Sequence, residues 1–149
     1  MTAQDNVTLA RSLADLYNSH QSDPAWLDKI GAAFAADSTS TNVPLGITLP
    51  GRDGYKQFAL FFAEAFPDSR VEITNVFATE DQFVFEYTGR GTNTGPLHLP
   101  TRDVPATGRW GELRFCDVFQ IRNGKITSHH TYYDMMTLLQ NLGLAPAMG

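Results

Sequence analysis

The chain has 149 residues, a hydrophobic content of 42% and a formal net charge of −5 at pH 7. This length predicts one domain over residues 1–149 with a sizeable core. The acidic balance argues against nucleic acid as a partner, because phosphates require a basic surface. One cysteine excludes an internal disulfide, and the polar N-terminus has no signal-peptide pattern, so we expect a cytoplasmic protein. No apolar run approaches the roughly 20 residues of a membrane span.

The first third of the chain predicts two helices and a strand. Asp5 is a candidate cap for a first helix, whose apolar face includes Leu13 and Tyr17. Pro24 fits the first turn of a second helix, which we expect to carry Phe34 on its apolar face. Residues 37–44 predict a short polar strand with three polar side chains on one side: Ser38, Ser40 and Asn42.

The middle of the chain predicts a third helix and two strands. Asp53 is expected to cap the helix, and aromatic residues, among them Phe58 and Phe62, give it a wide apolar face. Alternating apolar residues predict strands around 71–77 and 83–87, joined by a turn at residues 80 and 81. Residues 91–108 are rich in Gly, Pro and Thr and predict a long loop, which in a compact domain is more often functional than idle.

The segment 110–134 predicts a hairpin with one anomalous residue. Apolar side chains alternate through Leu113, Phe115 and Phe119, as in a half-buried strand. Asp117 falls on the same apolar face. A carboxylate there must be neutral, paired or facing a cavity, because burying it alone and charged costs several kcal/mol or more. Asp117 is therefore the first candidate functional residue.

The register of the hairpin decides which residue meets Asp117. A two-residue turn at Asn123 and Gly124 would place Asp117 opposite His130. A three-residue loop ending in a glycine bulge would place it opposite His129, with Thr131 and Tyr133 alongside. A slip of one residue exchanges the two faces of a strand, and periodicity alone fits both registers.

The order of elements predicts an α+β fold. A last helix, capped by Asp134 and closed by Gly143 before Pro146, follows the hairpin. Helices would pack on one face of a curved antiparallel sheet and leave an apolar pocket between the layers. Such a cone-shaped α+β barrel places the inner face of the hairpin against that pocket.

Two segments carry a resemblance to a known family. FPDSRVEITNVFATEDQFVFEYTGRGTNTG (66–95) and DVFQIRNGKITSHHTYYDMMTLLQNLGL (117–144) resemble the SnoaL-like polyketide cyclases, also called ester cyclases, of the nuclear-transport-factor-2-like, or ketosteroid-isomerase-like, superfamily. The resemblance extends from about Leu9 to Gly143. It implies a cone-shaped fold, a hydrophobic cavity and acid–base chemistry without a cofactor. It also favours the bulged register, with His129, Thr131 and Tyr133 inward.

The resemblance assigns roles to several positions. Asp117 resembles the protonated oxyanion-hole carboxylate of ketosteroid isomerases, whose neutral state in an apolar site is a known example of pKa tuning. His129 matches a pocket histidine of the cyclases. The base aspartate of the aldol cyclases falls at Thr131, and the base carboxylate of the isomerases falls at Asn42. Neither Thr nor Asn takes a proton near neutral pH, so the chain departs from both known reactions.

These observations predict an enzyme that acts on a hydrophobic carbonyl or epoxide substrate by cyclisation, isomerisation, dehydration or hydrolysis. Asp117 and His129 would share proton transfer. No cofactor is expected, and no metal, because His129 and His130 point to opposite faces of one strand. The alternative function is a binding module for a hydrophobic metabolite. A third possible function is that of an adaptor domain. The outward face of the hairpin predicts a homodimer. The expected substrate contacts are Tyr17, Asn42, Phe58, Phe62, Tyr87, Phe115, Phe119, Thr131 and Tyr133.

Overall fold

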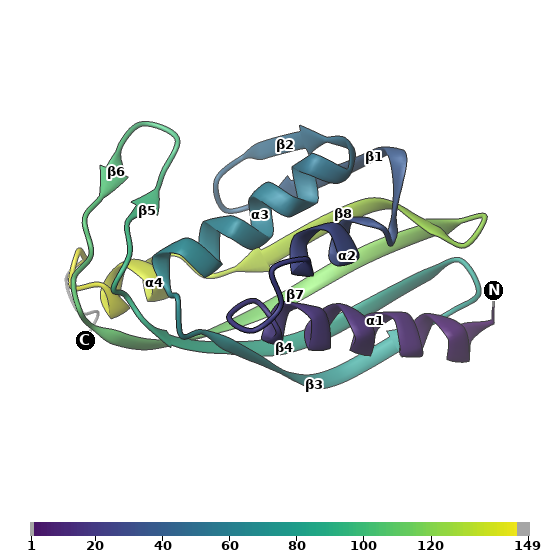
Figure 1. Ribbon diagram of the computed structural model, residues 1–149, viewed down its shortest axis with the longest axis horizontal. Helices are drawn as coiled ribbons and strands as arrows, with labels where there is room; N and C mark the ends of the chain where they lie inside the picture. The colour runs from purple at the N-terminus through teal and green to yellow at the C-terminus, as the bar shows by residue number, and fades with distance from the viewer. Residues whose placement is uncertain (1, 146–149) are drawn as a thin grey trace.

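The computed structural model describes residues 2–145 and shows four helices and eight strands in that range (Figure 1). The helices are α1 (Ala3–Asn18), α2 (Trp26–Gly31), α3 (Gly51–Ala65) and α4 (Met135–Asn141). The strands are β1 (Phe34–Asn42), β2 (Ile47–Pro50), β3 (Arg70–Ala78), β4 (Gln82–Thr92), β5 (Leu97–His98), β6 (Asp103–Val104), β7 (Trp110–Arg122) and β8 (Lys125–Tyr133). Pro146 lies outside the described residues.

Six strands form one sheet in the order β2-β1-β8-β7-β4-β3. The predicted α+β class is confirmed. The sheet is mixed rather than wholly antiparallel, since β1 runs parallel to its neighbour β8 while the other pairs are antiparallel. The chain reaches β8 long after β1, through α3 and the β3–β4–β7 meander, so local patterns could not predict this parallel pairing.

Helices α1 and α3 cover one face of the sheet, where α1 packs on β3 and β4 and α3 packs on β1 (Figure 1). Aromatic residues fill the space between the layers. Phe83 stacks on Phe119 at 4.4 Å, and Tyr87 stacks on Phe115 at 4.7 Å. Burying each such ring stabilises the fold by about 1.5–3 kcal/mol before entropic costs. Within the described range, no helix is both long and apolar enough to cross a membrane.

Three helix boundaries differ from the sequence expectation. Thr2 is the N-cap of α1, and Asp5 is its partner in a capping box rather than the cap itself. Helix α2 ends at Gly31, so Phe34 begins β1 instead of continuing the helix. Helix α3 starts at Gly51, which places Asp53 in its first turn. Asp134 does cap α4, as predicted, by accepting a hydrogen bond from the backbone N–H of Met136.

The β7–β8 hairpin combines parts of both registers considered above. Asn123 and Gly124 have φ of 52° and 75°, so they form a two-residue type I′ turn in which Arg122 pairs with Lys125. The predicted Gly124 bulge is wrong. An extra residue, Thr127, instead enters β8 between the pairs Ile121–Ile126 and Gln120–Ser128. This bulge shifts the faces of β8 by one residue and turns the His129 side chain inward.

Residues 91–108 were expected to form a long loop, but they contain the short β5–β6 hairpin. Asn93 is buried and fixes this segment. Its amide nitrogen donates to the carbonyls of Ala65 and Gly95, and its amide oxygen accepts from the backbone and hydroxyl of Thr107. Gly95 lies so close to α3 that an added Cβ would be 1.9 Å from the carbonyl oxygen of Glu64. The β5–β6 hairpin is thereby fastened to the end of α3.

Candidate active site

A buried carboxylate with three donors lies at the centre of the inner face. Asp117 is fully buried on β7. Its Oδ1 accepts a hydrogen bond from Thr131 Oγ1 at 2.7 Å, and its Oδ2 lies 2.8 Å from His129 Nε2. The hydroxyl of Tyr87 donates to Oδ2 at 3.2 Å. These donors offset the cost of burying the carboxylate, which the sequence had marked as the anomaly of this strand.

The strand pairing explains how these residues meet. Asp117 and Thr131 are direct cross-strand partners, whereas His129 is paired with Phe119 and reaches Asp117 diagonally. The expectation that His129 lies directly opposite Asp117 is therefore wrong in register. The two side chains nevertheless share the inner face and are hydrogen-bonded. His130 points to the other face, where its Nδ1 lies 3.5 Å from the Ser128 hydroxyl.

One nitrogen of the His129 ring is hydrogen-bonded, and the other has no hydrogen-bond partner in the part of the chain that the structure describes. Nε2 is engaged by Asp117, while Nδ1 is buried with no hydrogen-bond partner among the described residues. The edge of Tyr55 meets the ring at a centroid distance of 4.8 Å, and Phe58 lies at 5.1 Å. In the tautomer whose Nε2 donates to the Asp117 carboxylate, a neutral ring carries its lone pair on Nδ1. Nδ1 is thus the atom of this dyad that can take a proton from a ligand.

The tyrosines around the dyad hold their phenol protons firmly. Burial, followed by the negative charge of Asp117, raises the pKa of Tyr55 and of Tyr87 well above its ordinary value. Burial raises the pKa of Tyr17 to about 12 against the opposing hydrogen bond from Ser69. The pKa of Tyr133 is raised as well, chiefly by burial. All four phenols stay protonated at neutral pH and are excluded as general bases there.

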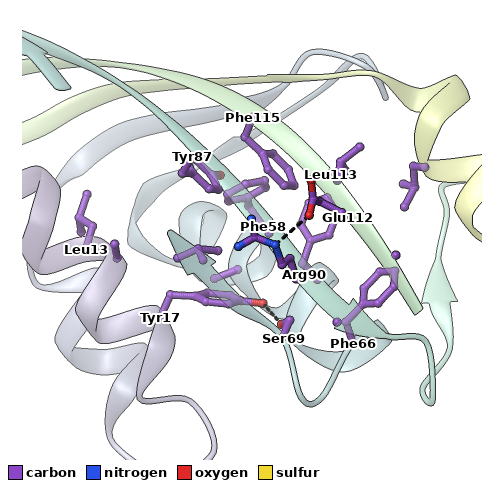
Figure 2. Close-up of a pocket in the computed structure, with 18 of the residues that line it drawn as sticks. Leu13, Tyr17, Phe58, Phe66, Ser69, Tyr87, Arg90, Glu112, Leu113 and Phe115 are labelled. Atoms are coloured by element: carbon purple, nitrogen blue, oxygen red, sulfur yellow. Dashed lines mark hydrogen bonds and ion pairs between the residues drawn. The ribbon is translucent and has the colours of Figure 1, made fainter. Parts of the chain in front are cut away.

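Two cavities flank the dyad. The first, here called the α1 cavity, has a volume of about 70 Å³ and lies between α1, α3, β4 and β7. Figure 2 shows Tyr17 directed at Ser69 in its wall, with oxygens 2.7 Å apart, and Arg90 donating to Glu112. Five of the expected substrate contacts line it: Tyr17, Phe58, Phe62, Tyr87 and Phe115.

The second cavity, here called the β1 cavity, has a volume of about 320 Å³ and lies between β1, β2 and α3. His129, Ser40 and Asn42 line it from the sheet. Its helix side includes Phe58, which also lines the α1 cavity and therefore separates the two spaces. His129 lines the β1 cavity, and neither dyad residue lines the α1 cavity, so the dyad adjoins a ligand only through the β1 cavity.

Three expected substrate contacts line neither cavity. Phe119 is fully buried behind the dyad, and Thr131 is occupied by Asp117. Tyr133 donates from its hydroxyl to Asn42 Oδ1 at 2.8 Å. Asn42 itself lines the β1 cavity, and its side chain also carries an N–H₂ donor. Tyr133 thus supports a cavity residue instead of forming the wall.

Sequence reasoning missed four residues of this region: Ser40, Tyr55, Glu64 and His98. The alternation of Ser38, Ser40 and Asn42 was visible, but it gave no reason to select the serine. His98 bridges β5 to α3, with Nε2 3.1 Å from Glu64 Oε2 and Nδ1 2.9 Å from Asp103 Oδ1. No local pattern brings these residues together. Over the described residues, no group of three or more His, Cys, Asp or Glu side chains could hold a metal ion.

Comparison with known proteins identifies the family. The profile of the SnoaL-like polyketide cyclases matches residues 7–142. The chain belongs to this family. The resemblance inferred from residues 66–95 and 117–144 is therefore confirmed. A search of curated proteins finds no significant match.

Several solved structures share the fold. A candidate SnoaL-like polyketide cyclase from Jannaschia sp. CCS1 is 19% identical with a TM-score of 0.82, over 98% of this chain and 96% of that one. AclR, a candidate hydroxylase from Streptomyces galilaeus, is 19% identical with a TM-score of 0.78, over 99% and 91% of the two chains. IdmH, a candidate polyketide cyclase from Streptomyces antibioticus, is 26% identical with a TM-score of 0.68, over 92% and 97%.

Proposed function

We propose that this protein is a cofactor-independent acid–base enzyme that acts on an apolar carbonyl- or epoxide-containing metabolite of the polyketide kind. The observation that supports it most is the hydrogen-bonded pair of His129 Nε2 and Asp117 Oδ2, with Nδ1 left vacant on a ring that lines the β1 cavity. A histidine held in this way can take a proton at Nδ1 and return it within one turnover.

The two members of the dyad have different tasks in this proposal. His129 is the catalytic residue, because its ring lines the cavity. Asp117 is a positioning residue, because it lines neither cavity and its oxygens are engaged by Thr131, Tyr87 and His129. It fixes the tautomer of the imidazole and stabilises the protonated ring by its charge. Proton transfer shared equally between the two residues is therefore no longer the favoured arrangement.

Membership in the SnoaL-like family supports the same class of chemistry, and the candidate cyclases among its structural relatives support a carbonyl substrate. Cyclisation or isomerisation through removal of a proton next to a carbonyl needs one base and a donor for the oxygen. His129 supplies the base, and the N–H₂ group of Asn42 is one donor within the same cavity. Thr131, at the base position of the aldol cyclases, instead holds Asp117 in place.

Exchange of carbon-bound protons tests the proposal without the natural substrate. β-Tetralone is an apolar ketone whose α-protons exchange slowly with deuterated water, and proton NMR follows the loss of signal. The wild-type protein should accelerate the exchange above the buffer rate. Asp117→Asn should lower the protein-dependent rate by about 10²-fold or more, the usual scale of lost acid–base catalysis, because His129 loses the partner that fixes its tautomer.

Cys116→Ser is the matched control, because Cys116 adjoins Asp117 on β7 but faces outward and lines neither cavity. It should leave the rate of exchange unchanged. A circular-dichroism melt of each variant checks that it is folded. Unaltered exchange in a folded Asp117→Asn protein would refute the acid–base dyad, as would the absence of any exchange by the wild type.

A non-catalytic binding module is the second candidate. It is favoured by the presence of Thr131 and Asn42 at the two positions where the known reactions of this superfamily have a carboxylate base. A carrier would bind β-tetralone, observed as ligand-dependent shifts in the protein NMR spectrum, without accelerating exchange. The same set of samples therefore distinguishes the two functions.

A further inference from the structure

Ser40 is a buried hydroxyl that the fold leaves without a partner. It lies in β1 with 4% of its surface exposed, and its Oγ makes no hydrogen bond within the described residues. Leaving a buried hydroxyl unpaired costs about 1–3 kcal/mol. Such a cost at a cavity wall is recovered when a ligand supplies the missing partner.

The strand pairing places Ser40 beside the proposed base. Ser40 and His129 are direct cross-strand partners in the parallel β1–β8 pair, and both line the β1 cavity. Neighbouring strands lie about 4.8 Å apart, and partner side chains share one face of the sheet. This spacing suits a carbonyl group, whose oxygen can meet one side chain while the hydrogen on the adjacent carbon meets the other.

Three other tyrosine hydroxyls in this region are already engaged. The phenol of Tyr87 donates to Asp117, that of Tyr17 is bonded to Ser69, and that of Tyr133 donates to Asn42. The hydroxyl of Ser40, in contrast, is buried and has no hydrogen-bond partner among the described residues. Ser40 also lines the same cavity as His129.

We propose that Ser40 donates a hydrogen bond to the carbonyl oxygen of the substrate in the β1 cavity and thereby selects ketones or esters with a hydrogen on the adjacent carbon. This assignment rests on the function proposed above. His129 Nδ1 takes the α-proton, the C–H electron pair forms the C=C bond of the enolate, and the carbonyl π electrons move to oxygen. The Ser40 hydroxyl stabilises that oxygen, and return of the proton from His129 to carbon restores the ketone. No other reactant is consumed.

Ser38 provides a matched control. It lies two residues earlier on β1, is 1% exposed, and its Oγ also has no partner in the part of the chain that the structure describes. It lines neither the α1 cavity nor the β1 cavity. Ser38→Ala and Ser40→Ala therefore remove the same buried group from the same strand, and they differ in access to the ligand.

The experiment is infrared difference spectroscopy of β-tetralone labelled with carbon-13 at its carbonyl. In the wild type, the carbonyl band of the bound ketone should lie at lower frequency than in an apolar solvent, because a hydrogen bond weakens the C=O bond. Ser40→Ala should return the band to the solvent position and lower the exchange rate by about 10²-fold, the scale of one lost oxyanion donor. Ser38→Ala should change neither.

A wild-type band at the solvent position would overturn the role of Ser40, as would a shifted band that persists in Ser40→Ala or disappears equally in Ser38→Ala. The exchange rate of the wild type separates this proposal from the function on which it rests. If the wild type does not accelerate exchange above the buffer rate while the band still depends on Ser40, the acid–base function fails. Ser40 then remains the carbonyl-binding residue of a binding module.

Discussion

At the scale of the residue, the site depends on how the hydrogen bonds of Asp117 are satisfied inside an aromatic core. Thr131 donates to Oδ1 and is itself fully buried, so water cannot replace it. Thr131 therefore supports the carboxylate. In the function proposed above, the proton acceptor is the neighbouring inward residue of β8, His129.

Thr131→Val tests this support, because valine keeps the shape of threonine and removes the donor. We expect a loss of about 1–3 kcal/mol in the free energy of unfolding, since Oδ1 of Asp117 becomes an unpaired buried acceptor. Urea denaturation measures the loss. Thr39→Val, at an exposed position of β1, is the control and should change stability by less than about 0.5 kcal/mol. Equal stability of the two variants would show that Asp117 does not depend on Thr131.

At the scale of the element, the β5–β6 hairpin forms part of the β1 cavity through His98. Leu97 and Val104 anchor its inner side in the core, and Asn93 fastens its base to the end of α3. On its outer side, His98 links Asp103 of the hairpin to Glu64 of α3. The contacts of Leu97, Val104 and Asn93 are apolar or neutral, whereas those of His98 with Asp103 and Glu64 are ionic when His98 is protonated. Only the contacts of His98 therefore respond to pH.

The hydrogen bond to Asp103 raises the pKa of His98 above 6.5, and the charges of Asp103 and Glu64 add to the effect. Because the folded-state pKa lies above the unfolded value, the link stabilises the hairpin fully below pH 6.5. The stabilisation is lost as the pH rises through the raised value. An NMR titration of the His98 ring should show its pKa falling toward 6.5 in Asp103→Asn and falling less in Glu64→Gln. A larger fall in Glu64→Gln would reverse the order of these causes.

At the scale of the whole molecule, alternation and capping predicted the α+β class, the inner face of β7 and the anomaly of Asp117. The sequence could not place the bulge of β8 at Thr127, because nothing local distinguishes that residue from its neighbours. The position of this one extra residue decides whether His129 or His130 faces inward. The family resemblance correctly predicted that His129 faces inward. It attributed this to a bulge at Gly124, whereas the extra residue in the structure is Thr127. Ser40 and His98 were missed because their significance depends on parallel pairing and on contacts between distant segments.

The outer face of the sheet predicts how copies of the chain associate. Helices α1 and α3 cover the inner face (Figure 1), while Val84 pairs with Val118 and Cys116 pairs with Tyr132 on the outer side of β4, β7 and β8. Tyr132 is 46% exposed. A mixed apolar patch of this kind suits a two-fold symmetric contact, in which the same residues meet from both copies. We therefore propose a homodimer that associates through these strands.

Val118→Arg tests the contact, because a two-fold axis would bring a like charge from each copy into the same apolar patch. Light scattering at micromolar concentration should give twice the chain mass of 16.5 kDa for the wild type and a single chain mass for the variant. Thr8→Arg adds the same charge at an exposed position on α1 and should remain dimeric. Because Val118 faces away from both cavities, monomeric Val118→Arg should keep the exchange rate of the wild type. A monomeric wild type would reject the homodimer outright, and a dimeric Val118→Arg protein would place the contact on another surface.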